Sequence, residues 1–359
     1  MNELSQYHET LGARLAPDQI PLDYGDLAQE YAAAKSGAIL LDRSHEGRIL
    51  LTGRDRFELV NRMSTNDMSE LAQHEGKPTV FTNPNARILF RASGYSLSSG
   101  LLLIGEAGQG EALANYLRRS IFFGDEATVE DISAETAQFA VHGKQADAAM
   151  MRLAPDASAI PALGCAEMET DLGRLIIARR KAICGGHWIV IGAREAAVAL
   201  HRDLLRRGAD CGLVPAGSLT YNCLRIGSGR PANLELSPDY MPLELGLWDE
   251  VSFSKGCYTG QEIIARMESR QRLAKTLVKV SLASMVAAPA PVYADGKLAG
   301  TLTSSAQAPD GEIHALAVLK LRYAQAGCRL TVGPGGIEAE VLEYAGAQPP
   351  FVRDATPTR

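Results

Sequence analysis

Cysteine is scarce in this 359-residue sequence, which contains six cysteines and two tryptophans. None of the cysteines forms a C-x-x-C pair, and none has a histidine at zinc-finger spacing. Six scattered cysteines in a long chain do not form the pattern of a secreted disulfide framework. We therefore expect reduced, mostly buried thiols in a cytoplasmic protein, with one exception described below.

Long apolar runs are also absent. No window approaches 18 uninterrupted apolar residues, so the sequence predicts no membrane-spanning helix. The first eight residues include an acid and no apolar run, which excludes a secretory signal and argues against an Arg-rich transit peptide.

An excess of positive charge is missing as well. The sequence has 36 Lys and Arg against 42 Asp and Glu, a net charge of −6, which argues against a general nucleic-acid coat but leaves room for a local basic patch. It also has no G-x-x-x-x-G-K-[ST] phosphate loop and no H-E-x-x-H zinc motif. Composition and generic motifs alone therefore assign no function.

Short helices and strands alternate along the first three quarters of the chain. Residues 26–36 are rich in helix formers behind Asp26, which suits an N-cap, and Gly37 ends this helix. Further helices are expected near residue 55, at 108–120 and at 194–207. Strand-like runs bounded by turn residues lie at 47–53, 78–82, 86–92, 100–104, 174–179 and 187–192. Hairpin-like turns predominate over βαβ units, which predicts an α+β fold with mainly antiparallel sheets.

The pattern changes after residue 273. Residues 276–282 alternate apolar and polar positions, Asp295-Gly296 is a strong hairpin signal, and 333–336 is another turn. No helix is expected from 276 to 345, so this region is predicted to be a small all-β barrel or sandwich. The expected domains are an α+β region at 1–272, the β domain at 273–345 and a Pro-rich disordered tail at 346–359.

One segment, residues 254–266, has a distinctive pattern. Gly256 and Gly260 flank the pair Cys257-Tyr258, and a helical pattern begins at Gln261. A cysteine in a loop beside Lys255 and near a helix N-terminus lies where a thiolate is stabilised. A packed loop thiol that joins two domains is the alternative interpretation.

The same segment carries a family resemblance. Lys255-Gly256-Cys257-Tyr258-x-Gly260-Gln261-Glu262 resembles the K-G-C-Y-x-G-Q-E hallmark of the YgfZ proteins. These are folate-binding relatives of the glycine-cleavage T-protein (GcvT), implicated in maintaining iron–sulfur enzymes and in tRNA modification. Further similarity to the family extends over most of the chain, at 41–45, 65–67, 225–231, 240–247, 300–305 and 315–317.

The resemblance implies a fold and a set of site residues. The fold is α+β, with GcvT-like folate-binding modules around a central pocket and a small all-β C-terminal barrel. The implied functional-thiol loop comprises Lys255, Gly256, Cys257, Tyr258, Gly260, Gln261, Glu262 and Arg266. The implied folate contacts are Asp42, Asn66, Asp67, Arg225 and Glu244. No residue is assigned to a resident metal.

Two departures from the T-protein pattern bear on activity. The T-protein element G-G-I-L-D-D reads Ala86 to Arg91 here, so Phe90 and Arg91 replace its two acids. Aminomethyl transfer needs a fixed carboxylate, so we expect this chain not to catalyse that reaction. The family's R-L-E-x-G glutamate, a folate contact, is Gly227 here, which leaves pterin recognition open.

A basic stretch overlaps the hallmark, with six cations and two acids between Lys255 and Lys279. It is either a solvated helix face or a surface for the folate glutamate tail, a nucleic acid or an acidic partner. The net negative charge of the chain argues against extensive RNA binding. If the chain contacts a nucleic acid directly, we expect residues 255–279 to make the contact.

Three functions stay open at this point. The leading one is a folate-binding accessory protein for iron–sulfur cluster assembly or repair, with tetrahydrofolate or a derivative as ligand. Its partners would be iron–sulfur assembly proteins or client enzymes, and Cys257 could bind a cluster transiently. The alternatives are a folate-dependent one-carbon transferase such as an aminomethyltransferase, and a folate-free adaptor on the same fold.

Overall fold

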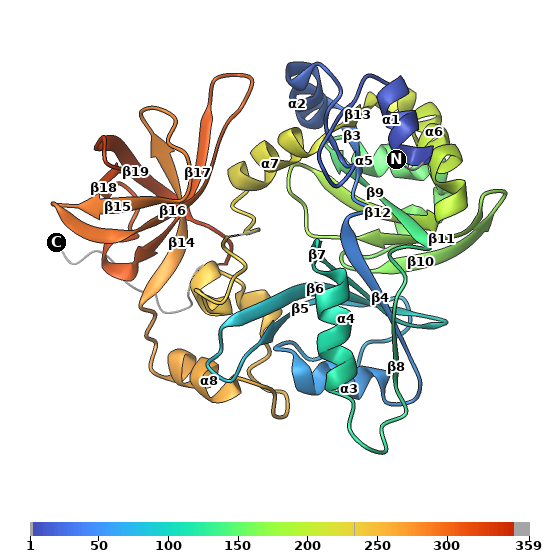
Figure 1. Ribbon diagram of the computed structural model, residues 1–359, viewed down its shortest axis with the longest axis horizontal. Helices are drawn as coiled ribbons and strands as arrows, with labels where there is room; N and C mark the ends of the chain where they lie inside the picture. Colours follow the sequence, from blue (N-terminus) through green and yellow to red (C-terminus); the bar gives the residue numbers. More distant parts are fainter. Residues whose placement is uncertain (1–2, 233, 348–359) are drawn as a thin grey trace. The chain divides into compact units, whose positions relative to one another are not determined.

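The computed structural model describes residues 3–232 and 234–347, a mixed α/β fold with two large open sheets, a two-stranded sheet and a closed antiparallel barrel (Figure 1). The chain divides into two compact units that interleave in sequence. The first unit comprises Met1–Val60, Met68–Lys77 and Ala92–Leu224, and the second comprises Asn61–Asp67, Pro78–Arg91 and Arg225–Arg359. The domain boundary expected at residue 272 stays a prediction.

A six-stranded sheet forms the core of the first unit. Its strands, in spatial order, are β10 (Cys165–Thr170), β11 (Gly173–Arg179), β12 (Gly186–Ala193), β9 (Thr136–Gly143), β3 (Ala38–Asp42) and β13 (Leu213–Ala216). All pairs are antiparallel except β13 with β3. Alternate residues of β12, Trp188 and Val190, pack into an apolar core with residues of three helices. These helices are α1 (Glu3–Thr10), α5 (Ala146–Leu153) and α6 (Ala197–Gly208).

A five-stranded sheet contains four of the predicted strands. Its order is β5 (Gly76–Thr82), β6 (Ile88–Leu97), β7 (Gly100–Ala107), β4 (Glu46–Thr52) and β8 (Thr128–Asp131). Helix α4 (Gly110–Arg119) lies against β4 and β8 (Figure 1). Strand β6 begins two residues later than predicted because Ala86 has a φ of 58° in a turn that Asn83 closes, with its Oδ1 accepting from the Arg87 amide.

The predicted C-terminal β domain is a closed barrel, as expected. Its strands, in order around the barrel, are β14 (Lys275–Leu282), β17 (Ile313–Lys320), β16 (Lys297–Gln307), β15 (Ala290–Ala294), β18 (Arg329–Val332) and β19 (Ile337–Tyr344). Val280, Leu302 and Leu319 are among the residues that fill its interior. The turn between β15 and β16 is Asp295-Gly296, where both residues have positive φ, as a two-residue hairpin requires.

The remaining elements are short. Helix α2 (Leu27–Ser36) has the predicted N-cap, since Asp26 Oδ1 accepts from the Gln29 amide at 2.9 Å. The other helices are α3 (Arg56–Met63), α7 (Ser218–Gly227) and α8 (Gln261–Ser269), and β1 (Arg14–Leu15) pairs with β2 (Pro21–Asp23). The 3-10 turns are η1 (Pro155–Ala159), η2 (Arg194–Ala196), η3 (Ala209–Cys211), η4 (Pro242–Leu245), η5 (Trp248–Glu250) and η6 (Leu321–Tyr323).

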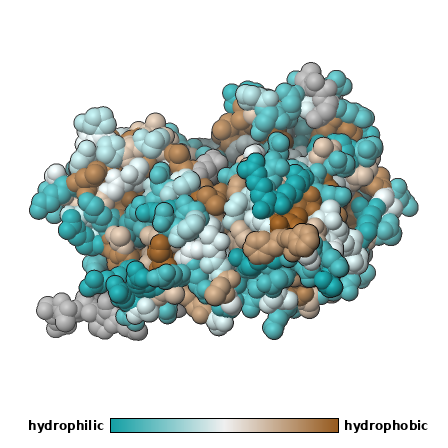
Figure 2. All heavy atoms as spheres, turned by 60° about the horizontal axis from the view of Figure 1, so that its bottom comes forward, coloured by the Kyte–Doolittle hydropathy of each residue, from teal (hydrophilic) through white to brown (hydrophobic). Residues whose placement is uncertain are grey.

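Polar residues cover most of the face shown in Figure 2, with apolar residues gathered in a few small groups. Among the described helices, none combines the length and apolar character needed to cross a membrane. The tail predicted at 346–359 lies outside the described residues from position 348 onward. Before that point the chain is fixed, because the Ala347 amide donates to the Gly246 carbonyl at 3.0 Å.

Candidate functional site

Lys255 anchors the hallmark loop within the second unit. Its side chain is buried, and its Nζ donates to the carbonyls of Ser64 at 2.9 Å and Asn66 at 2.8 Å, and also to that of Asn61. Three carbonyl oxygens therefore surround one ammonium group. The sequence placed this lysine beside the thiol, but the structure commits its charge to the backbone of residues 61–66.

Tyr258, which is buried, and Gly260, which is partly exposed, complete the frame of the loop. The Tyr258 ring is buried with the Lys255 ammonium 5.2 Å from its centroid, and burial raises the pKa of its hydroxyl to about 12. Gly260 has a φ of 84°, and a Cβ there would lie 2.8 Å from the Asn83 carbonyl oxygen. Glycine is therefore required where the loop turns into α8. Gln261 Nε2 donates back to the carbonyls of Lys255 and Gly256, at 3.4 Å each.

Four other residues of the predicted functional-thiol loop face solvent. Gly256, Cys257, Glu262 and Arg266 are all exposed. A Cβ on Gly256 would have no atom within 4 Å, so packing does not require glycine at this position. Arg266 Nη2 lies 2.5 Å from Glu262 Oε1 one helical turn away, an exposed pair that adds little to stability. The loop thus consists of a buried frame and an exposed Cys257.

The exposure of Cys257 distinguishes it from the other cysteines. All six lie within the described residues and none of them is in a disulfide, and Cys257 alone is exposed. Burial raises the pKa of Cys165 to about 12 and that of Cys184 to about 11, and burial followed by the charge of Asp295 raises that of Cys328. Those three thiols resist ionisation, whereas Cys257 is open to reagents and partners.

Asn66 and Asp67 lie in the segment that Lys255 binds. The Asn66 side-chain Nδ2 donates to the carbonyls of Pro78 at 2.8 Å and Asp249 at 3.3 Å, and its Oδ1 accepts from the Asp67 amide at 2.9 Å. The structure therefore brings Asn66 and Lys255 together, as parts of one hydrogen-bonded framework. The polar atoms of Asn66 serve this framework.

Arg91 occupies a place where the T-protein pattern has an acid. It is buried and forms a two-pronged ion pair with Glu250, with Nε to Oε2 at 2.8 Å and Nη2 to Oε1 at 2.5 Å. The Glu250 carboxylate is therefore neutralised by Arg91. The Glu250 carbonyl also accepts from Thr65 Oγ1 at 2.7 Å, which ties the pair to the segment bound by Lys255.

Arg225 and Glu244 are both buried, at separate places of the second unit. Arg225 Nη1 lies 3.4 Å from Glu235 Oε2, and Glu235 Oε1 accepts from Ser304 Oγ at 2.5 Å. Glu244 Oε2 accepts from the Met241 amide at 3.0 Å. Burial raises the pKa of Glu244 in spite of Lys275 and Arg87 at 4.0 and 3.7 Å.

Gly227, where the family pattern has a glutamate, faces His314 of β17. A Cβ at Gly227 would lie 3.3 Å from His314 Cε1 and Nε2. The imidazole therefore occupies the space into which a longer side chain would extend. Pterin recognition through a carboxylate at this position is excluded by the residue and by its neighbour.

Asp42 belongs to the first unit. Its Oδ2 accepts from His8 Nε2 at 3.1 Å, and its Oδ1 accepts from the Ser44 amide at 2.8 Å. Burial by itself would raise the pKa of Asp42, but these bonds and the charge of His8 hold it below its usual range. His8 is in turn bonded to Tyr24, with Nδ1 and Oη 2.8 Å apart.

A buried polar network of the first unit escaped the sequence analysis. Glu46 Oε1 accepts from Arg43 Nε at 2.9 Å, and Glu46 Oε2 accepts from Gln138 Nε2 at 2.7 Å and from Arg180 Nη1 at 3.1 Å. The Arg43 guanidinium also lies 4.2 Å from the centroid of the Tyr221 ring. Burial opposes ionisation of Glu46, but the two arginines hold its pKa well below the usual range. Arg180 lies 134 positions from Glu46 in the sequence, so no local pattern indicates this network.

Several cations of the basic stretch at 255–279 are bound to other groups of the chain. Lys275 Nζ donates to the Asp239 carbonyl at 3.0 Å, and Lys279 Nζ lies 2.8 Å from Glu343 Oε1. Arg270 and Arg272 are exposed after α8. Among residues 3–232 and 234–347, no three His, Cys, Asp or Glu side chains come together as metal ligands would.

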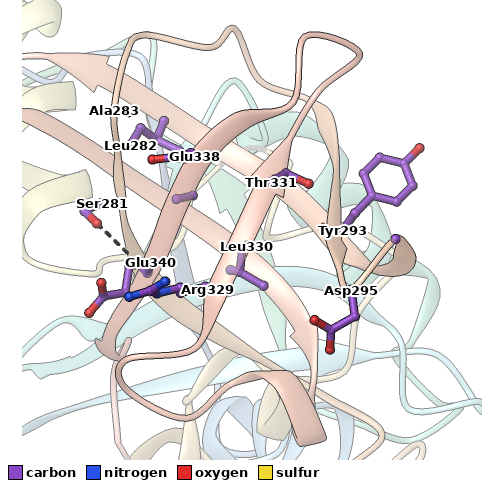
Figure 3. Close-up of a pocket in the computed structure, with 12 residues that line it drawn as sticks. Ser281, Leu282, Ala283, Tyr293, Asp295, Arg329, Leu330, Thr331, Glu338 and Glu340 are labelled. Atoms are coloured by element: carbon purple, nitrogen blue, oxygen red, sulfur yellow. Dashed lines mark hydrogen bonds between the residues drawn. The ribbon is translucent and has the colours of Figure 1, made fainter.

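A hollow on the barrel surface contains none of the predicted site residues. It lies between β14, β15, β18 and β19 and has a volume of about 740 Å³ (Figure 3). Its charged lining residues, Asp295, Arg329, Glu338 and Glu340, are all exposed. Exposed charges of both signs do not form a selective site, so the candidate functional site is the hallmark loop.

Known proteins resemble this chain over nearly its whole length. The GCVT N-terminal domain matches residues 4–255. A chloroplastic protein of Arabidopsis thaliana, named as a transferase, is 30% identical over 96% of this chain and 80% of its own length. An aminomethyltransferase of Caldanaerobacter subterraneus subsp. tengcongensis is 28% identical, over 87% of this chain and 85% of its own.

The same fold is found in a solved structure. The glycine cleavage system aminomethyltransferase T from Bartonella henselae superposes with a TM-score of 0.81 at 20% identity, covering 95% of this chain and 98% of that one. The domain match spans well over half of the sequence, and the Arabidopsis protein aligns along almost all of it. This chain belongs to the GcvT family of folate-binding proteins.

Proposed function

We propose that this chain is a YgfZ-type accessory protein that binds a reduced folate and serves iron–sulfur cluster assembly or repair. The observation that carries the proposal is the hallmark loop, in which buried Lys255 and Tyr258 fix the backbone and Cys257 alone among the cysteines is exposed. A rigid loop that exposes one thiol suits contact with a partner or a cluster, since its conformation is set before contact.

Cys257 would act as one ligand to a cluster that passes between proteins. On binding, the thiol gives its proton to solvent and the thiolate bonds to iron. A cluster normally takes four thiolates, so the other ligands would come from a partner or a client enzyme. The exposed arginines near α8, Arg270 and Arg272, would favour an acidic partner surface.

The chain's residues fit folate only in part. Members of the family use tetrahydrofolate, which carries one-carbon units when bound. In this chain Asn66 and Arg225 already bond to protein groups, and His314 lies over Gly227. We therefore propose folate as a ligand held by fewer contacts, and no transfer step through it.

An aminomethyltransferase is the second candidate, favoured by the names of several relatives at 26–28% identity. Against it stands Arg91, which pairs with Glu250 at a position where the T-protein pattern has an acid. A folate-free adaptor is the third candidate. It is favoured by Gly227, which stands where the family pattern has a folate-contacting glutamate.

Complementation tests the proposal. A strain lacking the gene is assayed for iron–sulfur enzyme activities after restoring the wild type, Cys257→Ser or Cys328→Ser. Cys328 is a partly exposed thiol on the barrel and serves as the matched control. We expect wild type and Cys328→Ser to restore activity and Cys257→Ser to fail. Full restoration by a stably expressed Cys257→Ser variant would refute the thiol role.

Calorimetry with tetrahydrofolate separates the remaining candidates. Heat of binding and a rise in the thermal midpoint favour a folate-binding protein over the adaptor, because a ligand of the native state stabilises it. The cytoplasmic location, the client enzymes and an effect on tRNA modification remain predictions that deletion and fractionation experiments address.

A further inference from the structure

Gly256 directly precedes the exposed thiol, yet the fold does not require a glycine there. Its φ is not positive, and a Cβ at this position would meet no atom within 4 Å. A loop glycine of this kind destabilises the protein relative to alanine, because it increases the conformational entropy of the unfolded chain. Glycine is also used where another molecule approaches the backbone closely. The open space over Gly256 adjoins Cys257, so it lies where a partner reaches the thiol.

Phe253, on the same loop, is an aromatic side chain that is 45% exposed. Its ring lies beside that of buried Trp248, with the centroids 6.1 Å apart and the planes inclined by 34°. The backbone on both sides is fixed, since the Ser252 amide donates to the Thr65 carbonyl at 2.9 Å and Ser252 Oγ accepts from the Lys255 amide at 3.2 Å. An aromatic ring on a fixed backbone loses little conformational entropy on contact with another protein, so Phe253 suits an interface anchor.

The exposed residues next to the thiol in the sequence are uncharged. We call the four exposed residues of this loop the thiol face: Phe253, Ser254, Gly256 and Cys257. The one cation among them in the sequence, Lys255, is buried. Exposed charges lie on either side of the thiol face along the chain, at Asp249 and from Glu262 onward. The centre of a protein–protein interface is depleted of charge and its rim is polar, which is the pattern found here.

The size of an ordinary protein–protein interface extends contact at Cys257 to the whole thiol face. A stable interface covers about 800 Å² of each partner, which corresponds to a disc with a radius of about 16 Å. Phe253 precedes Cys257 by four positions. Their Cα atoms are therefore at most about 14 Å apart, the reach of a fully extended chain. An interface centred on the thiol thus covers both Phe253 and Gly256.

We propose that the thiol face is the docking surface for the protein that shares a cluster with Cys257. That protein would present apolar side chains to Phe253 and bring the backbone beside its own cluster ligands close to Gly256. The inference rests on the proposed function, from which the role of Cys257 as a cluster ligand is taken. Nucleic acids and anionic membranes fit this surface less well, because both are bound through exposed cations and the thiol face has none.

Gly256→Gln tests the open space by filling it. Gly335→Gln is the matched control, because Gly335, in a turn of the barrel, also has no positive φ and no atom within 4 Å of a Cβ. Each variant of the full chain is restored to the deletion strain from a weak and from a strong promoter, and iron–sulfur enzyme activities are measured. With the weak promoter we expect Gly256→Gln to restore about a tenth of the wild-type activity or less, and Gly335→Gln to match the wild type. Both purified variants should keep a thermal midpoint within about 3 °C of the wild type, since the added side chains displace no atom.

Phe253→Ser tests the aromatic anchor, with Phe123→Ser as control because Phe123 is a fully exposed phenylalanine of the first unit. With the weak promoter we expect Phe253→Ser to restore about a tenth of the wild-type activity, and Phe123→Ser to match the wild type. The strong promoter should recover Phe253→Ser by mass action, because its thiol is intact and only the affinity is reduced. Phe253→Leu should retain most of the activity, since it keeps an apolar contact. Iodoacetamide should modify Cys257 at the wild-type rate in all of these variants.

Cys257→Ser, tested in the same strain, separates failure of the docking surface from failure of the proposed function. Full activity in Cys257→Ser would refute the proposed function and this inference with it. If Cys257→Ser is inactive while Gly256→Gln and Phe253→Ser are fully active from the weak promoter, the thiol role stands and the docking surface is refuted. Equal losses in the two control variants, or a lowered thermal midpoint that accounts for the losses at Gly256 and Phe253, would also overturn the inference.

Discussion

Arg91 and Glu250 form a buried, two-pronged ion pair in which Nε lies 2.8 Å from Oε2 and Nη2 lies 2.5 Å from Oε1. The two residues are 159 positions apart in the sequence, so the pair joins distant segments of the second unit. A buried pair of this kind adds little net stability, but the loss of one partner leaves the other charge uncompensated. The position therefore cannot accept an acid at low cost.

Arg91→Asp tests whether a T-protein-like acid can be restored. The new carboxylate would face Glu250, and we expect a loss of about 3–5 kcal/mol in the free energy of unfolding. We expect no aminomethyl transfer from a lipoyl-bound donor, even in the double variant Phe90→Asp/Arg91→Asp, because the supporting residues are absent. Urea unfolding and a methylene-tetrahydrofolate assay measure both effects.

Arg206→Asp is the control for that substitution. Arg206 forms an exposed ion pair with Asp203, and its side chain is 68% exposed. Reversing an exposed charge changes stability by only about 0–1 kcal/mol. The structural role assigned to the Arg91–Glu250 pair would be contradicted by an equally small loss of unfolding free energy in Arg91→Asp. It would also be contradicted by aminomethyl transfer in Phe90→Asp/Arg91→Asp.

Local sequence signals predicted the elements that local residues determine. Asp26 caps α2 as expected, and Asp295-Gly296 forms the expected hairpin turn of the barrel. The alternation in 276–282 predicted β14, because a barrel strand buries every second residue in one core. The late start of β6 was missed because Ala86, a residue without turn preference, takes a positive φ.

Long-range contacts of charged residues could not be predicted from the sequence. Lys255 binds carbonyls 189–194 positions away, and Arg180 binds Glu46 across 134 positions. Neither the backbone acceptors nor the distant partner leaves a mark in composition or periodicity. For that reason Lys255 was assigned to the thiol, and the network around Glu46 was not expected at all.

Acid sensitivity is expected from His201, which lies buried against His8 with ring centroids 4.9 Å apart. Burial, followed by the charge of His8, lowers the pKa of His201 to about 3. The unfolded chain therefore takes up this proton at a higher pH than the folded chain, near 6.5. The stability contributed by neutral His201 is complete above pH 6.5 and decreases as the pH falls toward 3.

His201→Phe removes this titration. When the pH falls from 7 to 5, the wild type should lose about 2 kcal/mol of unfolding free energy because of His201. The variant lacks this residue, so its total loss over the same range should be smaller by about 2 kcal/mol. The ring keeps its edge contacts with Tyr7 and Phe139, so the fold should be retained. Urea unfolding at several pH values measures the slope, and exposed His74→Phe is the control. Equal slopes in wild type and His201→Phe would contradict the assignment.

Lys255→Met separates framework from chemistry in the hallmark loop. The substitution keeps the length of the side chain but leaves three carbonyls without their ammonium donor. We expect a loss of about 2–4 kcal/mol in unfolding free energy. Lys320→Met, where the ammonium serves one exposed carbonyl at 2.7 Å, should lose much less. Unchanged stability in Lys255→Met would show that the three bonds do not hold the loop.

Cys257→Ala should show the opposite behaviour. The side chain is exposed, so its removal should change the unfolding free energy by no more than about 0.5 kcal/mol. Iodoacetamide should modify Cys257 of the native protein before Cys165 and Cys184, whose pKa values burial raises to about 12 and about 11. Mass spectrometry of the alkylated peptides gives the order of reaction.

The two variants together distinguish a functional thiol from a domain joint. If Cys257 acts chemically, Cys257→Ala is stable and loses iron–sulfur complementation, whereas Lys255→Met loses stability and complementation together. Lowering the growth temperature should then rescue Lys255→Met, because its thiol remains and only the framework is weakened. It should not rescue Cys257→Ala, since no temperature restores a missing ligand. Rescue of both variants would show that the hallmark acts through stability alone. Rescue of neither would show that Lys255 itself takes part in the chemistry.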